Sequence, residues 1–149
     1  MRYVFDTNIL IYYVRDKATK QYVEENFAPF DKGNDAIVSF VSVGEMKALA
    51  IKNGWGSKRK AALDRLLQKV VVIELKYDEL LEYYAQIDAY SQGKLPIGGT
   101  KFSARNMGKN DIWIAATTML VEGTLLTSDN DFDHLDRAFF RVKKIENID

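Results

Sequence analysis

Short apolar runs alternate with longer amphipathic segments along this chain. The runs are rich in β-branched and aromatic residues, which favours buried strands. The longer segments place apolar residues every three or four positions, as helices do. The predicted strands are Arg2–Phe5, Ala36–Phe40, Val70–Leu75, Thr124–Thr127 and Phe140–Ile145. The predicted helices are Thr7–Val14, Lys17–Phe27, Ser42–Asn53, Lys58–Gln68, Tyr77–Gln92 and Asp111–Glu122, followed by a helical turn at Asp131–Leu135.

This order of elements predicts an α/β fold of three layers. Alternating strands and helices favour a central, mostly parallel twisted sheet of about five strands with helices on both faces. Right-handed crossovers would bring the carboxyl ends of the strands to one edge, where open α/β sheets bind ligands. The length suits a single domain over residues 1–149.

Several helix starts carry a plausible capping residue. Ser42 precedes a helix and Glu45 stands three residues later, which matches a capping box. Ser57 and Asn110 are placed to cap the next helices, and Asp131 to cap the turn near the C-terminus.

Four acidic residues stand at or near the ends of apolar runs: Asp6, Glu45, Asp111 and Asp129. If the fold brings them to one sheet edge, they repel one another. At about 4 Å and an effective dielectric near 20, each like-charge pair costs roughly 4 kcal/mol. Such a cluster requires a divalent metal, raised pKa values or a fold that keeps the groups apart. A metal-dependent site is therefore a hypothesis to weigh against capping.

Capping alone accounts for some of these acids. Asp6 is a good helix N-cap, and the capping box explains Glu45. Asp111 is more informative, because the helix that it opens is apolar on all sides and should be buried. A buried carboxylate without a cation or hydrogen-bond donors costs several kcal/mol.

The acidic turn after the fourth strand leaves the last member of the site open. Asp129 is nearest to the strand end and is the first candidate, with Asp131 in reserve and Asp133 expected to face solvent. The single histidine, His134, is expected to be solvated in the same turn. The pair Gly98–Gly99 lacks the lysine pattern of a phosphate-binding loop.

Composition narrows the function classes only slightly. The chain is 47% hydrophobic and 28% charged, with zero net charge and no cysteine. Disulfides, thiolate metal sites and cysteine nucleophiles are thereby excluded, and a reducing cytoplasm is expected. The longest uncharged stretch, Ile112–Val121, is about half the length needed to span a bilayer, so no membrane association is expected.

Four sequence motifs in order carry a resemblance to a known family. They are DTNIL after the first strand, SVGE after the second, NDIWIAAT opening the buried helix, and LLTSDNDF after the fourth strand. Over essentially the whole chain, this set resembles the PIN-domain ribonucleases, and most of all the VapC toxins of toxin–antitoxin pairs. The resemblance implies a metal-dependent endoribonuclease in the cytoplasm, partnered by an antitoxin and a second copy of the chain.

The same resemblance assigns roles to individual residues. It implies that Asp6, Glu45, Asp111 and Asp129 hold Mg²⁺ or Mn²⁺ and carry catalysis, with Asp131 as the reserve ligand. Thr7 or Ser128 would hydrogen-bond a ligand or a metal-bound water, Asn8 would brace the loop, and Asn110 would support the site.

An RNA substrate requires positive surface, which local charge provides despite the neutral total. Lys58, Arg59 and Lys60 form one basic cluster, which could hold flanking RNA. Arg105 and Lys109, with Lys94 and Lys101 in the same loop, could approach the scissile region. The alternative is that these groups are ordinary solvated side chains.

Other functions stay open from the sequence. The same chemistry could serve RNA maturation instead of a toxin, and the acids could merely cap helices in a non-catalytic nucleic-acid-binding module. A haloacid-dehalogenase-like phosphatase would need a second aspartate where Asn8 stands. The RNA target, the number of ions and the oligomer size cannot be deduced from the residues.

Overall fold

A five-stranded parallel sheet forms the centre of the computed structural model, which describes residues 1–95 and 102–149. The strand order is β3-β2-β1-β4-β5, and every neighbouring pair is parallel. The strands are β1 (Arg2–Phe5), β2 (Asp35–Ser39), β3 (Val71–Ile73), β4 (Thr124–Thr127) and β5 (Arg141–Lys144). The predicted α/β class and strand number are confirmed.

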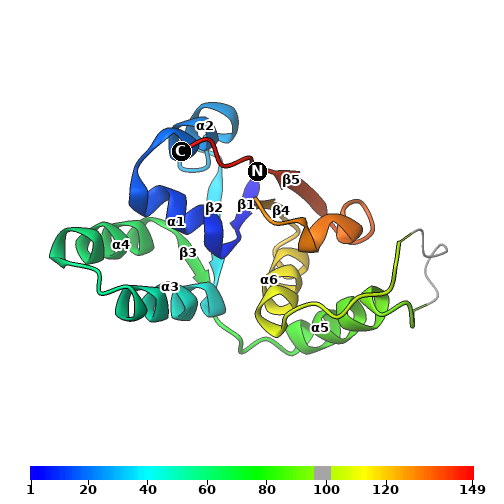
Figure 1. Cartoon of the computed structure of the whole chain (residues 1–149). Helices are drawn as coiled ribbons and strands as arrows, with labels where there is room; N and C mark the ends of the chain where they lie inside the picture. Colours follow the sequence, from blue (N-terminus) through cyan, green and yellow to red (C-terminus); the bar gives the residue numbers. More distant parts are fainter. Residues whose placement is uncertain (96–101) are drawn as a thin grey trace.

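Helices cover both faces of this sheet (Figure 1). One layer contains α1 (Thr7–Arg15), α2 (Ala18–Phe27), α3 (Phe40–Lys52) and α4 (Ser57–Lys69). The other contains α5 (Asp78–Ser91), α6 (Lys109–Leu120) and the 3₁₀ helix η1 (Asn130–Leu135). The three-layer arrangement that the alternation predicted is present.

Alternate residues of the central strands enter different cores. Phe5 of β1 packs in the core beneath α1 and α3, whereas Val4 packs in the core beneath α5 and α6. Leu126 and Leu125 of β4 divide in the same way. This period of two is a consequence of strand geometry, and burial on both faces explains why these strands are continuously apolar in sequence.

The strand order creates a switch point between β1 and β4. From β1 the chain proceeds outward to β2 and β3, then crosses back to β4 and β5 on the other side. Parallel α/β sheets bind ligands outside the carboxyl ends of the strands at such a point. Asp6 follows β1 and Asp129 lies two residues after β4, so both acids lie at this crevice.

The start of α3 differs from the prediction. The helix begins at Phe40, not Ser42, and Ser39 is its N-cap, accepting a hydrogen bond from the amide of Val41. Ser42 is therefore a buried residue inside the helix, and the predicted capping box with Glu45 is wrong. Two serines three residues apart offer the same capping signal, and the end of β2 decides between them.

Three other predicted caps are also wrong. Gly56 precedes α4, so Ser57 is its first residue, and Gly108 precedes α6, so Asn110 is inside its first turn. Neither glycine offers a capping side chain. Asp129, not Asp131, caps η1 by accepting a hydrogen bond from the amide of Asp131.

Most of the aromatic residues near the N-terminus belong to the core. Tyr12, Tyr13 and Trp55 are buried, and Ile11 packs against the same core. These side chains therefore contribute to the core beneath α1 and α4. Within the described ranges, every helix falls short of the length and apolarity that crossing a membrane requires.

Two glycines should respond oppositely to alanine. A Cβ at Gly123 would lie 3.1 Å from the carbonyl oxygen of Arg2 and 3.2 Å from Val4 Cγ2. The backbone of β1 would have to shift to make room for this Cβ. We therefore expect Gly123→Ala to lower the free energy of unfolding by about 1–3 kcal/mol. Gly44 lies inside α3 with nothing within 4 Å, so Gly44→Ala should raise it by about 0.5–1 kcal/mol. Urea unfolding of both variants measures this, and equal shifts would contradict it.

Candidate metal centre

Asp6 is both a helix cap and the most enclosed acid of the site. It is only 4% exposed and stands between β1 and α1. Its Oδ1 accepts a hydrogen bond from the amide of Thr7 at 2.7 Å. Its Oδ2 accepts from Thr127 Oγ1 at 2.7 Å and from Asn8 Nδ2 at 3.2 Å. Capping and a place in the acidic cluster are thus compatible for this residue.

The surroundings of Asp6 disfavour its charge despite these donors. Burial raises the pKa of Asp6 from its ordinary value of 3.8 to about 6, even though hydrogen bonds from Thr127 and Thr7 act to lower it. The negative charges of Asp129 and Glu45 raise it further. Three donors are not enough to compensate the ionised carboxylate, which indicates that a positive charge would be stabilised here.

Asp111 is held in the first turn of α6, where its side chain is half-buried. Burial raises the pKa of Asp111 to about 7, and the charges of Asp6, Asp129, Asp131 and Glu45 add to the effect. The fold therefore brings all four sequence-predicted acids, and the reserve residue, close enough to act on one another.

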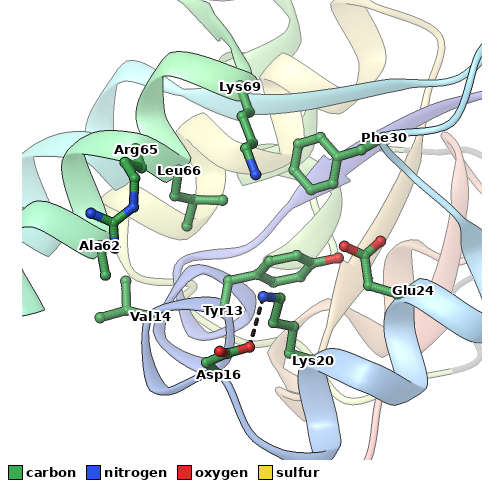
Figure 2. A pocket seen from close by; sticks show the side chains of 10 residues that line it. All are labelled: Tyr13, Val14, Asp16, Lys20, Glu24, Phe30, Ala62, Arg65, Leu66 and Lys69. Carbon is green, nitrogen blue, oxygen red and sulfur yellow. Dashed lines mark hydrogen bonds and ion pairs between the residues drawn. The ribbon is translucent and has the colours of Figure 1, made fainter.

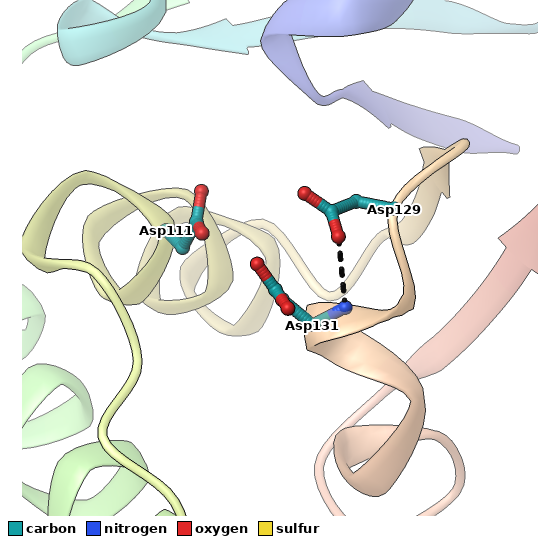
Figure 3. A group of neighbouring side chains, drawn as sticks. All are labelled: Asp111, Asp129 and Asp131. Atoms are coloured by element: carbon teal, nitrogen blue, oxygen red, sulfur yellow. Dashed lines mark hydrogen bonds between the residues drawn. The ribbon is translucent and has the colours of Figure 1, made fainter.

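The carboxylates of Asp111, Asp129 and Asp131 form the tightest group. One oxygen from each lies within 4.8 Å of the others, a spacing that could hold a metal ion. Figure 3 shows Asp111 on α6 facing the two aspartates at the start of η1. Partial burial and then the charge of Asp129 raise the pKa of Asp131, while the charge of Arg105 lowers it. Asp129 and Asp131 both belong to the cluster, so this geometry does not select one of them.

Glu45 is positioned by a hydroxyl instead of by a capping box. Thr7 Oγ1 donates a hydrogen bond to Glu45 Oε1 at 2.7 Å and lies 3.0 Å from Ser42 Oγ. Glu45 and Asp111 line one open pocket of about 440 Å³. The capping alternative therefore fails, and Glu45 lies half-buried and close enough for its charge to act on Asp6 and Asp111.

A network of polar side chains joins the loops that carry Asp6 and Asp129. Asn8 links them, because its Nδ2 donates to Asp6 and its Oδ1 accepts from the amide of Ser128 at 3.3 Å. The hydroxyl of Ser128 accepts a hydrogen bond from Tyr12 at 2.9 Å. These bonds fix the two loops relative to each other before any ligand binds.

Thr127 is a site residue that sequence reasoning missed. Its fully buried hydroxyl donates to Asp6 and accepts from the amide of Asp129 at 3.0 Å, so it connects two acids directly. The available signal was a polar residue directly after the apolar pair Leu125 and Leu126 of β4, immediately before the acidic turn.

The donor set fits a hard divalent cation. The cluster offers carboxylate oxygens, which Mg²⁺ and Mn²⁺ prefer. Asp6 and Asp111 both have raised pKa values, so the cluster carries more negative charge than its surroundings compensate. A bound cation would reverse this balance.

The predicted basic residues divide between two places. Lys109 and Asn110 line the same pocket as Glu45 and Asp111, and the charge of Arg105 reaches Asp131. Lys58 and Arg59 line a different groove between the end of α1 and α4, and Lys60 is exposed beside them. Lys101 lies outside the described residues, as do Gly98 and Gly99.

A separate cavity of about 200 Å³ lies between α1, α2 and α4, and none of the five clustered acids lines it. Figure 2 shows the Tyr13 ring in this cavity with its hydroxyl beside Glu24, while Lys20 pairs with Asp16 at 2.7 Å. Burial, with the nearby Glu24 charge, raises the pKa of Tyr13, so its hydroxyl stays protonated. The cavity does not belong to the acidic site.

His134 is not the solvated residue that the sequence predicted. Its Nε2 lies 2.7 Å from Ser91 Oγ, and its ring packs against Tyr90 and Phe102. Burial, and the charge of Arg105, lower the pKa of His134 to about 4, so the ring is neutral at pH 7. The charged turn around it in sequence concealed the packing from α5 and the segment before α6.

Comparisons with known proteins agree with the α/β fold. A family model described as the PIN domain matches residues 3–138. No curated protein matches the chain. Among solved structures, the chain is similar to VapBC2 of Rickettsia felis, which was solved with a DNA fragment from its promoter. The TM-score is 0.78 at 20% identity, and the match covers 98% of this chain and 100% of the other.

Two further solved structures share the fold. VapBC-1 of Haemophilus influenzae has a TM-score of 0.72 at 21% identity, covering 97% of this chain and 98% of its own. VapBC-5 of Mycobacterium tuberculosis, described as a member of the VapBC family of toxin–antitoxin systems, has a TM-score of 0.60 at 19% identity. It covers 98% of each chain. At sequence identities of 19–21%, the likeness to these structures shows a shared fold and nothing further.

Proposed function

This chain belongs to the PIN-domain family, and on that premise we propose that it is a metal-dependent endoribonuclease that hydrolyses RNA phosphodiester bonds. The observation that carries the proposal is the group of three carboxylate oxygens within 4.8 Å of one another, from Asp111, Asp129 and Asp131, beside the buried Asp6. Structural acids rarely gather at one sheet edge with raised pKa values, whereas catalytic acids often do.

The acids would hold Mg²⁺ or Mn²⁺. Asp6, Glu45, Asp111 and Asp129 are the proposed ligands, and Asp131 joins them because it belongs to the tight group. Such an ion, when bound, polarises a phosphate and lowers the pKa of an attacking water. The attacking water is the nucleophile in this proposal. His134 is not assigned a part in activating it, because its Nε2 is occupied by Ser91 and it lies three residues beyond the cluster.

The residues around the acids would orient the substrate. Lys109 at the pocket and Arg105 near Asp131 carry positive charge toward the position where a phosphate must approach the acids. Thr7 and Ser128 hold hydroxyl groups at the same edge, and Asn8 braces the two loops between them. Cations beside a carboxylate cluster reduce the repulsion that the phosphate would otherwise meet.

The proposed biological role is the toxin of a VapBC-type pair in the cytoplasm. The supporting fact is that similar folds occur in structures described as VapBC proteins, one of them as a member of the VapBC family of toxin–antitoxin systems. A cognate antitoxin would bring a basic side chain or an amphipathic helix to the acidic pocket. The chain would also form a homodimer, and exposed apolar side chains such as Phe40 and Leu81, which are 53% and 63% exposed, are available for that contact.

The direct test is RNA cleavage by the purified chain with Mn²⁺, with Mg²⁺ and with a chelator, followed by sequencing of the RNA ends. We expect cleavage only with metal. A non-catalytic binding module would instead leave RNA intact, and calorimetric titration would then show no Mn²⁺ binding or binding that survives the loss of Asp6. Growth inhibition on expression, relieved by a neighbouring gene product, would separate a toxin from an RNA-maturation enzyme.

The basic cluster of Lys58, Arg59 and Lys60 should hold RNA at a distance from the acids. We expect the triple change to glutamate to weaken RNA binding and to flatten its salt dependence, because three phosphate contacts are lost. The slope of log K against log salt should become shallower by roughly two for single-stranded RNA. Filter binding at several salt concentrations measures this. The helix itself should persist, since acids in the first turn of α4 interact favourably with its dipole.

A matched control makes the same change of net charge elsewhere. Lys17, Lys32 and Lys76 are exposed and lie on separate segments, so their reversal alters total charge equally without disrupting one cluster. If both triple variants flatten the slope equally, or if neither does, the basic cluster has no specific role in RNA binding.

A further inference from the structure

Ser91 lies where three separate segments meet. It is the last residue of α5 and is fully buried. Its Oγ is 2.7 Å from His134 Nε2 on η1 and donates to Met107 Sδ at 3.2 Å. Its carbonyl oxygen accepts a hydrogen bond from the amide of Arg105 at 2.8 Å. One residue therefore connects α5, η1 and the segment 102–107 that leads into α6.

The hydrogen bonds of this junction form a consistent chain. A thioether sulfur only accepts, so the Ser91 hydroxyl hydrogen is directed to Met107. With the hydroxyl hydrogen so placed, the 2.7 Å contact to His134 Nε2 uses the ring tautomer that carries its hydrogen on Nε2. The other ring nitrogen, Nδ1, is buried without a partner among the described residues, which disfavours a second ring proton. His134 is thus a neutral ring whose Nε2 is occupied by Ser91.

The rings around His134 hold it in place. Tyr90 stacks on it with ring centroids 6.3 Å apart and planes 10° apart, and Phe102 lies 5.0 Å away. On the same 3₁₀ helix, Asp131 precedes His134 by three residues, which is one turn, so the two side chains lie on the same side of η1. Contacts that fix His134 therefore also fix the orientation of the side of η1 that carries Asp131.

We propose that Ser91 and His134 are a pair of positioning residues that fasten the segment 102–107 to η1 and thereby hold Arg105 beside Asp131. The pair takes no part in the chemistry, and its effect on catalysis rests on the proposed nuclease function. In Figure 1 the segment before α6 runs back along α5 to the start of α6, which agrees with its hydrogen bond to the end of α5. Ser91 contacts this segment at two points, the amide of Arg105 itself and Met107 Sδ, so the Arg105 guanidinium follows the placement of the segment.

The test is a double-mutant cycle between the pair and Arg105. His134→Phe keeps an aromatic ring against Tyr90 and Phe102 but removes the bond to Ser91. We expect it to lower kcat/KM for RNA roughly tenfold, mainly through KM, because Arg105 contacts substrate outside the acid group. In an Arg105→Ala background, the same change should alter kcat/KM less than twofold. A tenfold fall in both backgrounds, or in neither, would overturn the proposal.

Two controls separate positioning from stability and from the proposed function. Thr19→Val removes a buried hydroxyl bonded to the C-terminal segment, and should lower stability without changing kcat/KM. Hydrogen exchange without RNA should become faster in residues 102–107 of both His134→Phe and Ser91→Ala, and stay unchanged in α4. If the wild type cuts no RNA while exchange responds as expected, the nuclease function fails and the positioning role stands. Unchanged exchange in 102–107 overturns the positioning role whether or not RNA is cut.

Discussion

Asp111→Asn is expected to abolish RNA cleavage, with kcat lower by at least about a thousandfold, while the chain remains folded. Asparagine keeps the size of the side chain but removes the charge that a divalent cation requires. At pH 8 the variant should be at least as stable as the wild type without metal, because the pKa of about 7 shows that the folded state disfavours this charge. Cleavage rates and thermal unfolding measure the two effects.

The matched control for this variant is Asp133→Asn. Asp133 lies on η1 close to the acidic group in sequence, but it is exposed and pairs with Lys144 at 2.9 Å. Its loss should leave the cleavage rate within about threefold and change stability by less than about 1 kcal/mol. Full activity in a folded Asp111→Asn variant would contradict the proposed function, and growth inhibition by that variant in cells would do so independently.

Binding of Mn²⁺ should weaken on the order of 100-fold as pH falls from 7.5 to 5.5. Asp6 and Asp111 must be ionised to bind the ion, and their pKa values are about 6 and about 7. Over that range the ionised fraction falls about fourfold for Asp6 and about 25-fold for Asp111, and the product is ~100-fold. Calorimetric titration at both pH values, in two buffers at each, measures the affinity and the protons released.

Stability without metal should change with pH in the opposite sense to metal affinity. Both folded-state pKa values are raised above the unfolded value of 3.8, so the folded chain binds protons more strongly. The unfolding midpoint should therefore fall as pH rises from about 4 through about 7. Asp111→Asn should show a shallower fall, whereas Asp133→Asn should follow the wild type. A Mn²⁺ affinity that changes less than threefold across the range would contradict the assigned ligands.

The local sequence predicted the elements well because burial imposes its own pattern. Central strands buried on both faces, such as β1 and β4, must be continuously apolar, and the helices that cover them must be amphipathic. The helix starts were predicted less well. Ser39 and Ser42 are both good caps, and only the register of β2 in the sheet decides which serine the helix begins after.

Glu45 and His134 show the limits of local context most clearly. A capping box explained Glu45 from the residues alone, but the structure directs its carboxylate to Thr7, 38 residues earlier. His134 has charged neighbours in sequence, yet its contacts are Ser91, Tyr90 and Phe102, from elements that precede it by more than 30 residues. Contacts of this kind leave no periodic signal.

The sequence by itself determined that this is an α/β chain with four acidic residues at or near the ends of apolar runs, because hydrophobic burial and strand geometry leave a local pattern. Only the tertiary structure decided how those acids meet. The crossing from β3 back to β4 places Asp129 and Asp131 opposite Asp111, beside Asp6 at the end of β1. Electrostatic repulsion and lost hydration depend on distance through space, so the raised pKa values that indicate a metal centre appear only after the chain has folded.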